Sequence, residues 1–109
     1  MLLVFGSRAR GDAREGSDWD FGYLAGPAFD PDDLLARLVL ALCNDRVDLV
    51  DLSRASGLLR YRAAAEGHSI FEGREHAFED FWFEAASFWC DVQPVVRDAY
   101  EGVLERLSP

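Results

Sequence analysis

Residues 2–20 read LLVFGSRARGDAREGSDWD, and this stretch is more informative than any other part of the chain. The apolar run 2–5 has the length of a buried strand, and it stops at Gly6, where a backbone without a Cβ can turn sharply or approach a ligand closely. Ser7 follows at the point where a helix would begin, and it can cap free backbone N–H groups or offer its hydroxyl to a phosphate. Taken alone, this Gly–Ser dipeptide fits an ordinary strand–turn–helix better than a ligand site.

Two aspartates of the next predicted strand strengthen the case for a ligand site. Asp18 and Asp20 flank Trp19, and side chains alternate faces along a strand, so both carboxylates share the face opposite the indole. Two ionised carboxylates on one face repel each other unless water or a cation screens them. Mg²⁺ is the hard cation that usually joins carboxylates to substrate phosphates. A solvated, aspartate-rich turn is the alternative interpretation.

A third aspartate lies in the next apolar segment, RVDLVDL at 46–52. Apolar residues on both sides of Asp48 predict a core strand, in which an acidic residue needs a specific reason. Asp51 is expected at or just beyond the end of this strand, where it would cap a helix near Ser53. A buried acid satisfied by neighbouring donors is one interpretation of Asp48, but three separated acids with a Gly–Ser turn form a far more specific set than any one of them.

These elements together resemble the minimal nucleotidyltransferases of the polymerase-beta superfamily, small proteins that often act as antitoxins. The resemblance rests on GSRARG at 6–11, SDWD at 17–20 and VDLV at 47–50, in this order, and it covers roughly the first half of the chain closely. It implies a polymerase-beta-like fold of the α/β (α+β) class, in which a small mixed sheet is packed with helices.

The resemblance also implies roles for individual residues. Gly6 and Ser7 would hold the triphosphate of ATP, and Arg8 and Arg10 would steady the phosphates or, as exposed helix arginines, only solvate a surface. The catalytic acids and Mg²⁺ ligands would be Asp18, Asp20 and Asp48. Asp48 would also help to activate an incoming hydroxyl. Positioning and charge neutralisation supply most of what such a transfer requires.

The sequence departs from the family pattern at two points. Members commonly carry a helix ahead of the first strand, whereas here that strand begins at Met1 or Leu2, which would leave one face of the sheet uncovered. Trp19 occupies a position where a smaller aliphatic residue is usual. We expect its ring to pack on a helix as part of the core.

Length and composition favour one compact domain over residues 1–109, with a catalytic part at 1–73 and a helical segment at 74–107. No apolar stretch approaches a membrane span and no signal peptide is recognisable, so we expect a cytoplasmic protein. The formal net charge of −9 argues against a long DNA or RNA substrate, because basic residues are interspersed with acids. An acidic surface suits a basic protein partner, or simply solubility.

Apolar periodicity and turn residues predict the order of the elements. Strands are expected at 2–5, 19–24, 47–51 and, as a short edge strand, 68–71; helices at about 7–14, from Asp30 to about Cys43, near 54–65, and from Arg74 onward. The core stripe of the second helix would be Leu34, Leu35, Leu38, Val39 and Leu42. Gly67 should end the third helix, and Pro94 should kink or divide the last one.

The last third carries apolar residues at helical spacing, namely Phe78, Phe81, Trp82, Ala85, Phe88, Trp89, Val92 and Val96. Packing against the sheet is the simpler interpretation. Phe83 lies off this stripe, however, and the aromatic content exceeds what one narrow seam needs, which favours a partner surface or an oligomer contact as well. The resemblance implies a small helical HEPN-type toxin as that partner.

The sequence therefore predicts an enzyme that moves AMP from ATP, with Mg²⁺, onto a hydroxyl of a HEPN-type toxin, most naturally a tyrosine, and so acts as its antitoxin. The alternative is a non-catalytic binding module that occludes its partner through the aromatic C-terminal helix. Intact acids favour the enzyme, and the short N-terminus favours the binding module. A third hypothesis, a small-molecule acceptor as in antibiotic-modifying relatives, would call for an additional acceptor domain, which we do not expect here.

Overall fold

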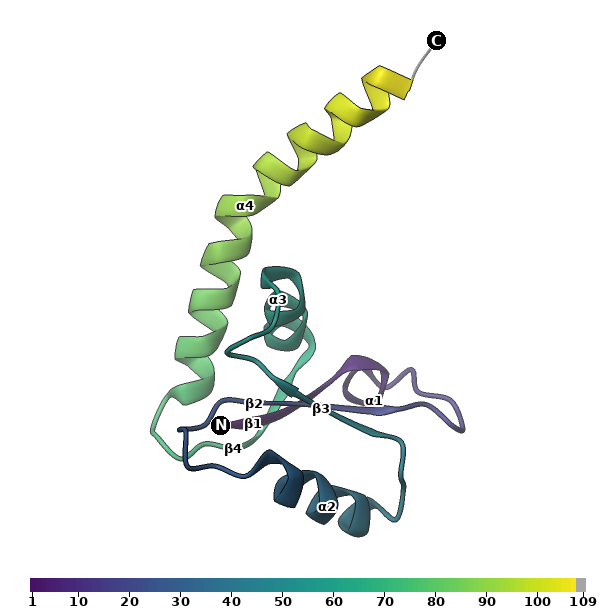
Figure 1. The fold of residues 1–109 in the computed structure, drawn as a ribbon, viewed down its shortest axis with the longest axis vertical. Coiled ribbons are helices and arrows are strands. Elements are labelled where there is room, and N and C mark those ends of the chain that lie inside the picture. The colour runs from purple at the N-terminus through teal and green to yellow at the C-terminus, as the bar shows by residue number, and fades with distance from the viewer. Residues whose placement is uncertain (108–109) are drawn as a thin grey trace.

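The computed structural model describes residues 1–107, in which strands and helices alternate (Figure 1). The strands are β1 (Leu2–Phe5), β2 (Trp19–Tyr23), β3 (Val47–Asp51) and β4 (His68–Phe71). The helices are α1 (Gly6–Arg10), α2 (Pro31–Leu42), α3 (Gly57–Glu66) and α4 (Ala77–Leu107). The predicted α/β (α+β) class with a long C-terminal helical segment is confirmed.

The four strands form one mixed sheet in the order β3-β2-β1-β4. β1 runs antiparallel to both of its neighbours, whereas β2 and β3 are parallel because α2 crosses over between them. β4 is an edge strand, as predicted. β3 is the other edge, and Asp48 is exposed there, so the interpretation of this residue as a buried acid is wrong.

Local sequence explains where the first two helices begin and end. The Asp30 side chain accepts hydrogen bonds from the main-chain N–H groups of Asp32 and Asp33, so α2 begins as predicted. In contrast, α1 ends at Arg10 and not near residue 14, because Gly11 adopts a left-handed conformation with φ of 84° and closes the helix. The Gly–Ser turn therefore leads into little more than one helical turn.

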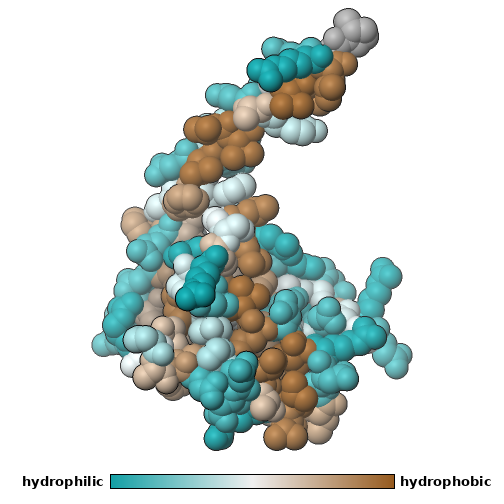
Figure 2. Space-filling model, in the orientation of Figure 1, coloured by the Kyte–Doolittle hydropathy of each residue, from teal (hydrophilic) through white to brown (hydrophobic). Residues whose placement is uncertain are grey.

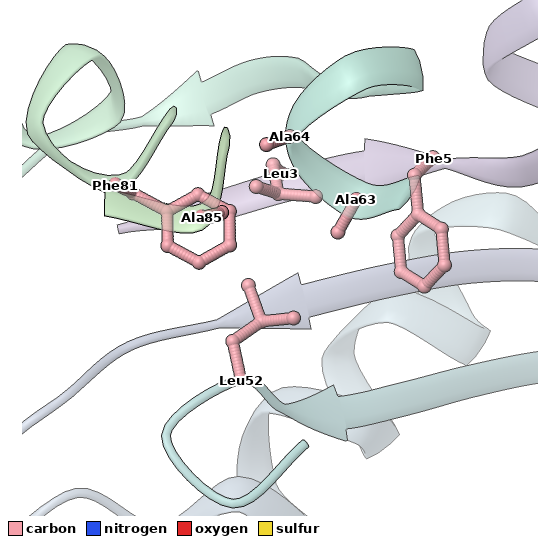
Figure 3. Packing of buried hydrophobic residues seen from close by; sticks show 7 residues of the cluster. All are labelled: Leu3, Phe5, Leu52, Ala63, Ala64, Phe81 and Ala85. Carbon is pink, nitrogen blue, oxygen red and sulfur yellow. The ribbon is translucent and has the colours of Figure 1, made fainter. Parts of the chain in front are cut away.

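The core lies between the sheet and two helices, α3 and α4 (Figure 3). Its buried residues are Leu3, Phe5, Leu52, Ala63, Ala64, Phe81 and Ala85. Phe81 is only 2% exposed, so the first turns of α4 belong to the core. On the other side of the sheet lies α2 (Figure 1), whose predicted leucine and valine stripe is half-buried.

Helix α4 is continuous over 31 residues although it contains Pro94. Its axis changes direction about halfway along (Figure 1), so the proline bends the helix without dividing it. The second half projects away from the body and carries apolar surface (Figures 1 and 2). Exposed apolar residues there include Val95, Val96, Tyr100, Val103 and Leu107. Of the helices in residues 1–107, none has the length and apolarity that crossing a membrane requires.

Candidate active site

Two of the predicted acids lie side by side on adjacent strands. Asp20 of β2 and Asp48 of β3 are register partners in the parallel pair, so their side chains share one face of the sheet. Asp18 precedes β2 by one residue and is exposed, while Asp20 is half-buried. Burial raises the pKa of Asp20 above its ordinary value, and the charges of Asp48 and Asp18 raise it further. The fold thus gathers negative charge around Asp20.

Gly6 lies directly against one of these carboxylates. A Cβ added at this position would overlap Oδ2 of Asp20 and lie 3.1 Å from its Cγ. The residue also has φ of 75°, in the left-handed region that favours glycine. Gly6 was expected to turn sharply or to approach a ligand closely, and the group beside it in this structure is the carboxylate of Asp20.

The two residues that follow Gly6, Ser7 and Arg8, make different contacts. The Ser7 main-chain oxygen accepts hydrogen bonds from the N–H groups of Gly11 and Asp12, and no side chain caps the start of α1, so the expected capping role of Ser7 is not seen. Arg8 donates from Nη2 to the Ser17 main-chain oxygen at 3.0 Å. Its guanidinium lies 4.9 Å from the centre of the Trp19 ring. Arg8 is thus engaged with the loop before Asp18.

Trp19 was expected to pack on a helix as a core residue. It is half-buried, and its ring stacks against Phe21 at 6.1 Å between ring centres as well as beneath Arg8. The helix that it meets is therefore α1, through a charged side chain, and the buried core cluster does not include it. Sequence periodicity gave the correct face but not the partner.

Two arginines of α1 and α3 border the acids. Arg10 contacts Glu66 through Nη1 at 3.0 Å, and Nε of Arg62 lies 3.8 Å from the other oxygen of Glu66. Both arginines oppose the rise in the pKa of Asp20. Sequence analysis did not single out Arg62 or Glu66, because an arginine and a glutamate four apart on a helix look like an ordinary surface pair. Only the packing of α3 beside α1 brings them to the site.

The donor set suits a hard divalent cation. Mg²⁺ is usually held by one or two carboxylates together with substrate phosphates, and Asp20 with Asp48 provides such a pair. The mutual repulsion that raises the pKa of Asp20 is the kind that a bound cation relieves. Within residues 1–107, no three acidic, histidine or cysteine side chains are already gathered at metal-binding distances.

Comparisons with known proteins point to one family. A family model described as "Polymerase beta, Nucleotidyltransferase" matches residues 1–76, a segment that contains all six predicted site residues and ends just before α4. A curated relative, "Protein adenylyltransferase MntA" of Aphanizomenon flos-aquae (strain 2012/KM1/D3), is 30% identical over 74% of this chain. The chain spans 62% of the length of that relative.

Solved structures with a similar fold come from toxin–antitoxin complexes. One is a crystal structure of a toxin–antitoxin with AMP-PNP, matched with a TM-score of 0.76 and 29% identity over 94% of this chain and 84% of that chain. Another holds a tri-AMPylated Shewanella oneidensis HEPN toxin in complex with an MNT antitoxin, matched with a TM-score of 0.69 and 27% identity over 94% of this chain and 81% of that chain.

Proposed function

This chain belongs to the polymerase beta nucleotidyltransferase family, and on that premise we propose that it transfers AMP from ATP onto a hydroxyl of a HEPN-type toxin and thereby acts as its antitoxin. The observation that carries the proposal is the pairing of Asp20 with Asp48 across adjacent strands, with Gly6 against Asp20. A curated relative named as a protein adenylyltransferase, and a similar chain in a complex with an AMPylated toxin, support it. A tyrosine is the proposed acceptor.

In this proposal, Asp18, Asp20 and Asp48 hold Mg²⁺, and Gly6 and Ser7 lie beside the phosphates. In the in-line displacement, the acceptor oxygen would bond to the α-phosphorus of ATP as the bond to the β-phosphate breaks and pyrophosphate leaves, and bound Mg²⁺ would supply charge neutralisation at the phosphates. Asp48 is exposed on the edge strand β3, so an acceptor hydroxyl can reach it from solvent, and in this proposal it would take the proton of that hydroxyl. Asp20 is half-buried and lies directly against Gly6.

We further propose that two parts of one domain, spanning residues 1–109, have different roles. Residues 1–73 carry the catalytic sheet and helices, and α4 provides the contact with the toxin. Exposed apolar residues on its projecting half support this role, as does an open groove of about 480 Å³ beside α3 whose lining includes Arg60, Phe83 and Phe88. A cytoplasmic location and the absence of a long nucleic-acid substrate accompany the proposal.

The test is intact-mass spectrometry of the toxin encoded beside this chain, after incubation with the purified chain, ATP and Mg²⁺. We expect a gain of one or more AMP units, and none with the Asp18→Asn/Asp20→Asn variant, whose fold is checked by circular dichroism. Modification that persists in the double variant would remove these acids from the mechanism. A toxin that binds the wild-type chain but is never modified would reject the enzyme.

The binding-module alternative is favoured by the exposed apolar residues of α4, and it makes a different prediction. Under that hypothesis the double acid variant still neutralises the toxin in cells, and shortening α4 abolishes neutralisation. A break at Gly73 would remove Phe81 and Ala85 from the core, so the informative truncation ends at residue 93, where the buried part of the helix is kept. Under the enzyme hypothesis, the double variant loses neutralisation.

A further inference from the structure

The loop at 11–18, which leads into the first two acids, is held by arginines from two sides. Arg8 of α1 donates to the Ser17 main-chain oxygen at 3.0 Å, and Arg46, just before β3, donates from Nη1 to the Gly16 main-chain oxygen at 2.8 Å. The N–H of Trp19 donates in turn to the Arg46 main-chain oxygen at 2.8 Å. The backbone on both sides of Asp18 is thus tied to its neighbours.

Arg8 is fixed more firmly than its place on a short surface helix requires. Its guanidinium lies over the Trp19 ring, which stacks on Phe21 with 12° between the ring planes. Its Nε is buried and has no hydrogen-bond partner within residues 1–107. Burying a charged N–H without a partner is unfavourable, so the remaining contacts of Arg8 must hold it there.

Trp19 is the residue through which this arrangement reaches the acids. It lies between Asp18 and Asp20 and points to the opposite face of the strand. Contact of the Arg8 guanidinium with its ring can therefore orient both aspartates without entering the space where a metal and phosphates would bind. A large flat ring offers a surface on which a guanidinium can stack, which a small aliphatic side chain does not.

We propose that Arg8 is a positioning residue that orients Asp18 and Asp20 through Trp19 and the Ser17 carbonyl, in place of the phosphate-binding role expected from the sequence. The inference rests on the proposed function, because it assumes that these acids bind a divalent cation. Arg8 donates from Nη2 to the Ser17 main-chain oxygen in the loop, and its guanidinium lies over the ring of Trp19 at the start of β2. Supporting groups of this kind tune metal affinity without touching the metal.

The test measures Mn²⁺ binding to the whole chain by electron paramagnetic resonance, without nucleotide and again with the non-transferable analogue α,β-methylene-ATP. Arg8→Gln is expected to weaken Mn²⁺ binding by about 10- to 100-fold in both conditions, as for other residues that orient metal ligands. Arg8→Lys, which can still donate to Ser17 but stacks less well, should recover part of the loss. Urea unfolding of each variant confirms that it is folded under the conditions used.

The matched control is Arg14→Gln, which removes one arginine charge from the loop at 11–18 that Arg8 contacts. Arg14 is exposed, and within the described residues its hydrogen bonds are made by its main chain alone. This variant should bind Mn²⁺ as the wild type does. Equal weakening in Arg14→Gln and Arg8→Gln would mean that charge alone is responsible, and would overturn the proposal.

Two further outcomes also decide against the positioning role. If Arg8→Gln binds Mn²⁺ normally without nucleotide but weakly with the analogue, Arg8 is a phosphate ligand. If Trp19→Leu leaves the Arg8→Gln effect undiminished, Arg8 does not act through the Trp19 ring.

A wild-type chain that binds Mn²⁺ but never modifies a toxin would refute the proposed AMP transfer to a toxin and leave the role of Arg8 standing. A wild-type chain that binds no Mn²⁺ would refute both.

Discussion

Replacing Asp48 with asparagine is expected to slow AMP transfer by about 100- to 1,000-fold, the usual cost of removing one group that acts on the charge of a transition state. The same change should stabilise the metal-free protein, because Asp48 is one of the charges that raise the pKa of Asp20. The transfer rate is measured by mass spectrometry under single-turnover conditions, and stability by urea unfolding in the presence of a chelator.

The sign of the stability change follows from linkage. A pKa that is higher in the folded state favours folding below the ordinary pKa of the group, and this contribution is lost as the pH rises through the folded-state pKa. At neutral pH, ionised Asp20 beside Asp48 therefore opposes folding. Removing the charge of Asp48 relieves that repulsion, and added Mg²⁺ should stabilise the wild type more than the variant.

Asp51→Asn is the matched control, three residues further along β3. Asp51 accepts hydrogen bonds from the main-chain N–H of Ser53 at 3.0 Å and from its hydroxyl at 2.6 Å, and these hold the pKa of Asp51 below its ordinary value. A lowered pKa stabilises the fold above the ordinary pKa, and this contribution is lost as the pH falls through the folded-state pKa. Asp51→Asn should therefore lower stability at neutral pH and keep the transfer activity.

Asp48→Asn is thus expected to slow transfer and to stabilise the metal-free protein, whereas Asp51→Asn should keep transfer and lower stability. If Asp48→Asn destabilised the chain and retained transfer, Asp48 would be a structural surface residue. The proposal that Asp20 and Asp48 act together in the reaction would then be wrong. If Asp51→Asn abolished transfer without unfolding, the third acid would be Asp51. Either result is readable from the same two measurements.

The sequence was most informative where function depends on neighbouring residues. Gly6, Asp18 and Asp20 lie within one short stretch, and the apolar runs around them predicted the strands β1 and β2 correctly, so spacing alone was enough to group these residues as one candidate site. Asp48 was singled out because apolar residues flank it in a predicted strand, where an acidic residue needs a specific reason. That this strand lies at the edge of the sheet, which leaves Asp48 exposed, depends on strand order, and no local pattern states that order.

Residues that support the site were predicted less well. Arg8 was expected to steady the phosphates or only to solvate a surface, and neither expectation anticipated its contact with the Trp19 ring. The border formed by Arg62 and Glu66 arises from α3 packing beside α1, a contact between segments far apart in sequence. The spacing of such charged residues in the sequence does not show whether they lie beside a functional site or on a helix face that contacts only solvent.

Helix α4 shows a similar limit. Its apolar stripe keeps one helical spacing throughout, yet Phe81 is buried while Val96 is exposed, because the sheet and α3 cover only the first half of the helix. Even in the first half, Trp82 and Phe88 of the predicted stripe are exposed, so periodicity identified the apolar face but not which of its residues become buried. The aromatic stripe is therefore partly core and partly open surface.

Gly6→Ala is expected to reduce transfer by at least about 100-fold, because a displacement of the reacting groups by about 1 Å has an effect of that size. Asp20 can avoid overlap with the new Cβ only by moving its carboxylate, since Oδ2, Cγ and Cβ of Asp20 all lie close to the position of that atom. The left-handed backbone at Gly6 adds a stability cost of about 1–2 kcal/mol for a residue with a side chain.

Gly11→Ala separates these two effects. Gly11 has φ of 84°, so it carries the same backbone cost, but a Cβ at this position meets nothing within 4 Å. Urea unfolding should therefore show the backbone cost in both variants and a further loss in Gly6→Ala from the overlap with Asp20, while transfer should fall steeply only in Gly6→Ala. If the alanine at position 6 left transfer unchanged, the carboxylate of Asp20 would have room to move without consequence, and its contact with the Gly–Ser turn would not define the active geometry. An equal loss of transfer in both variants would instead trace the effect to the conformation of α1, because that is the only feature that the two substitutions share.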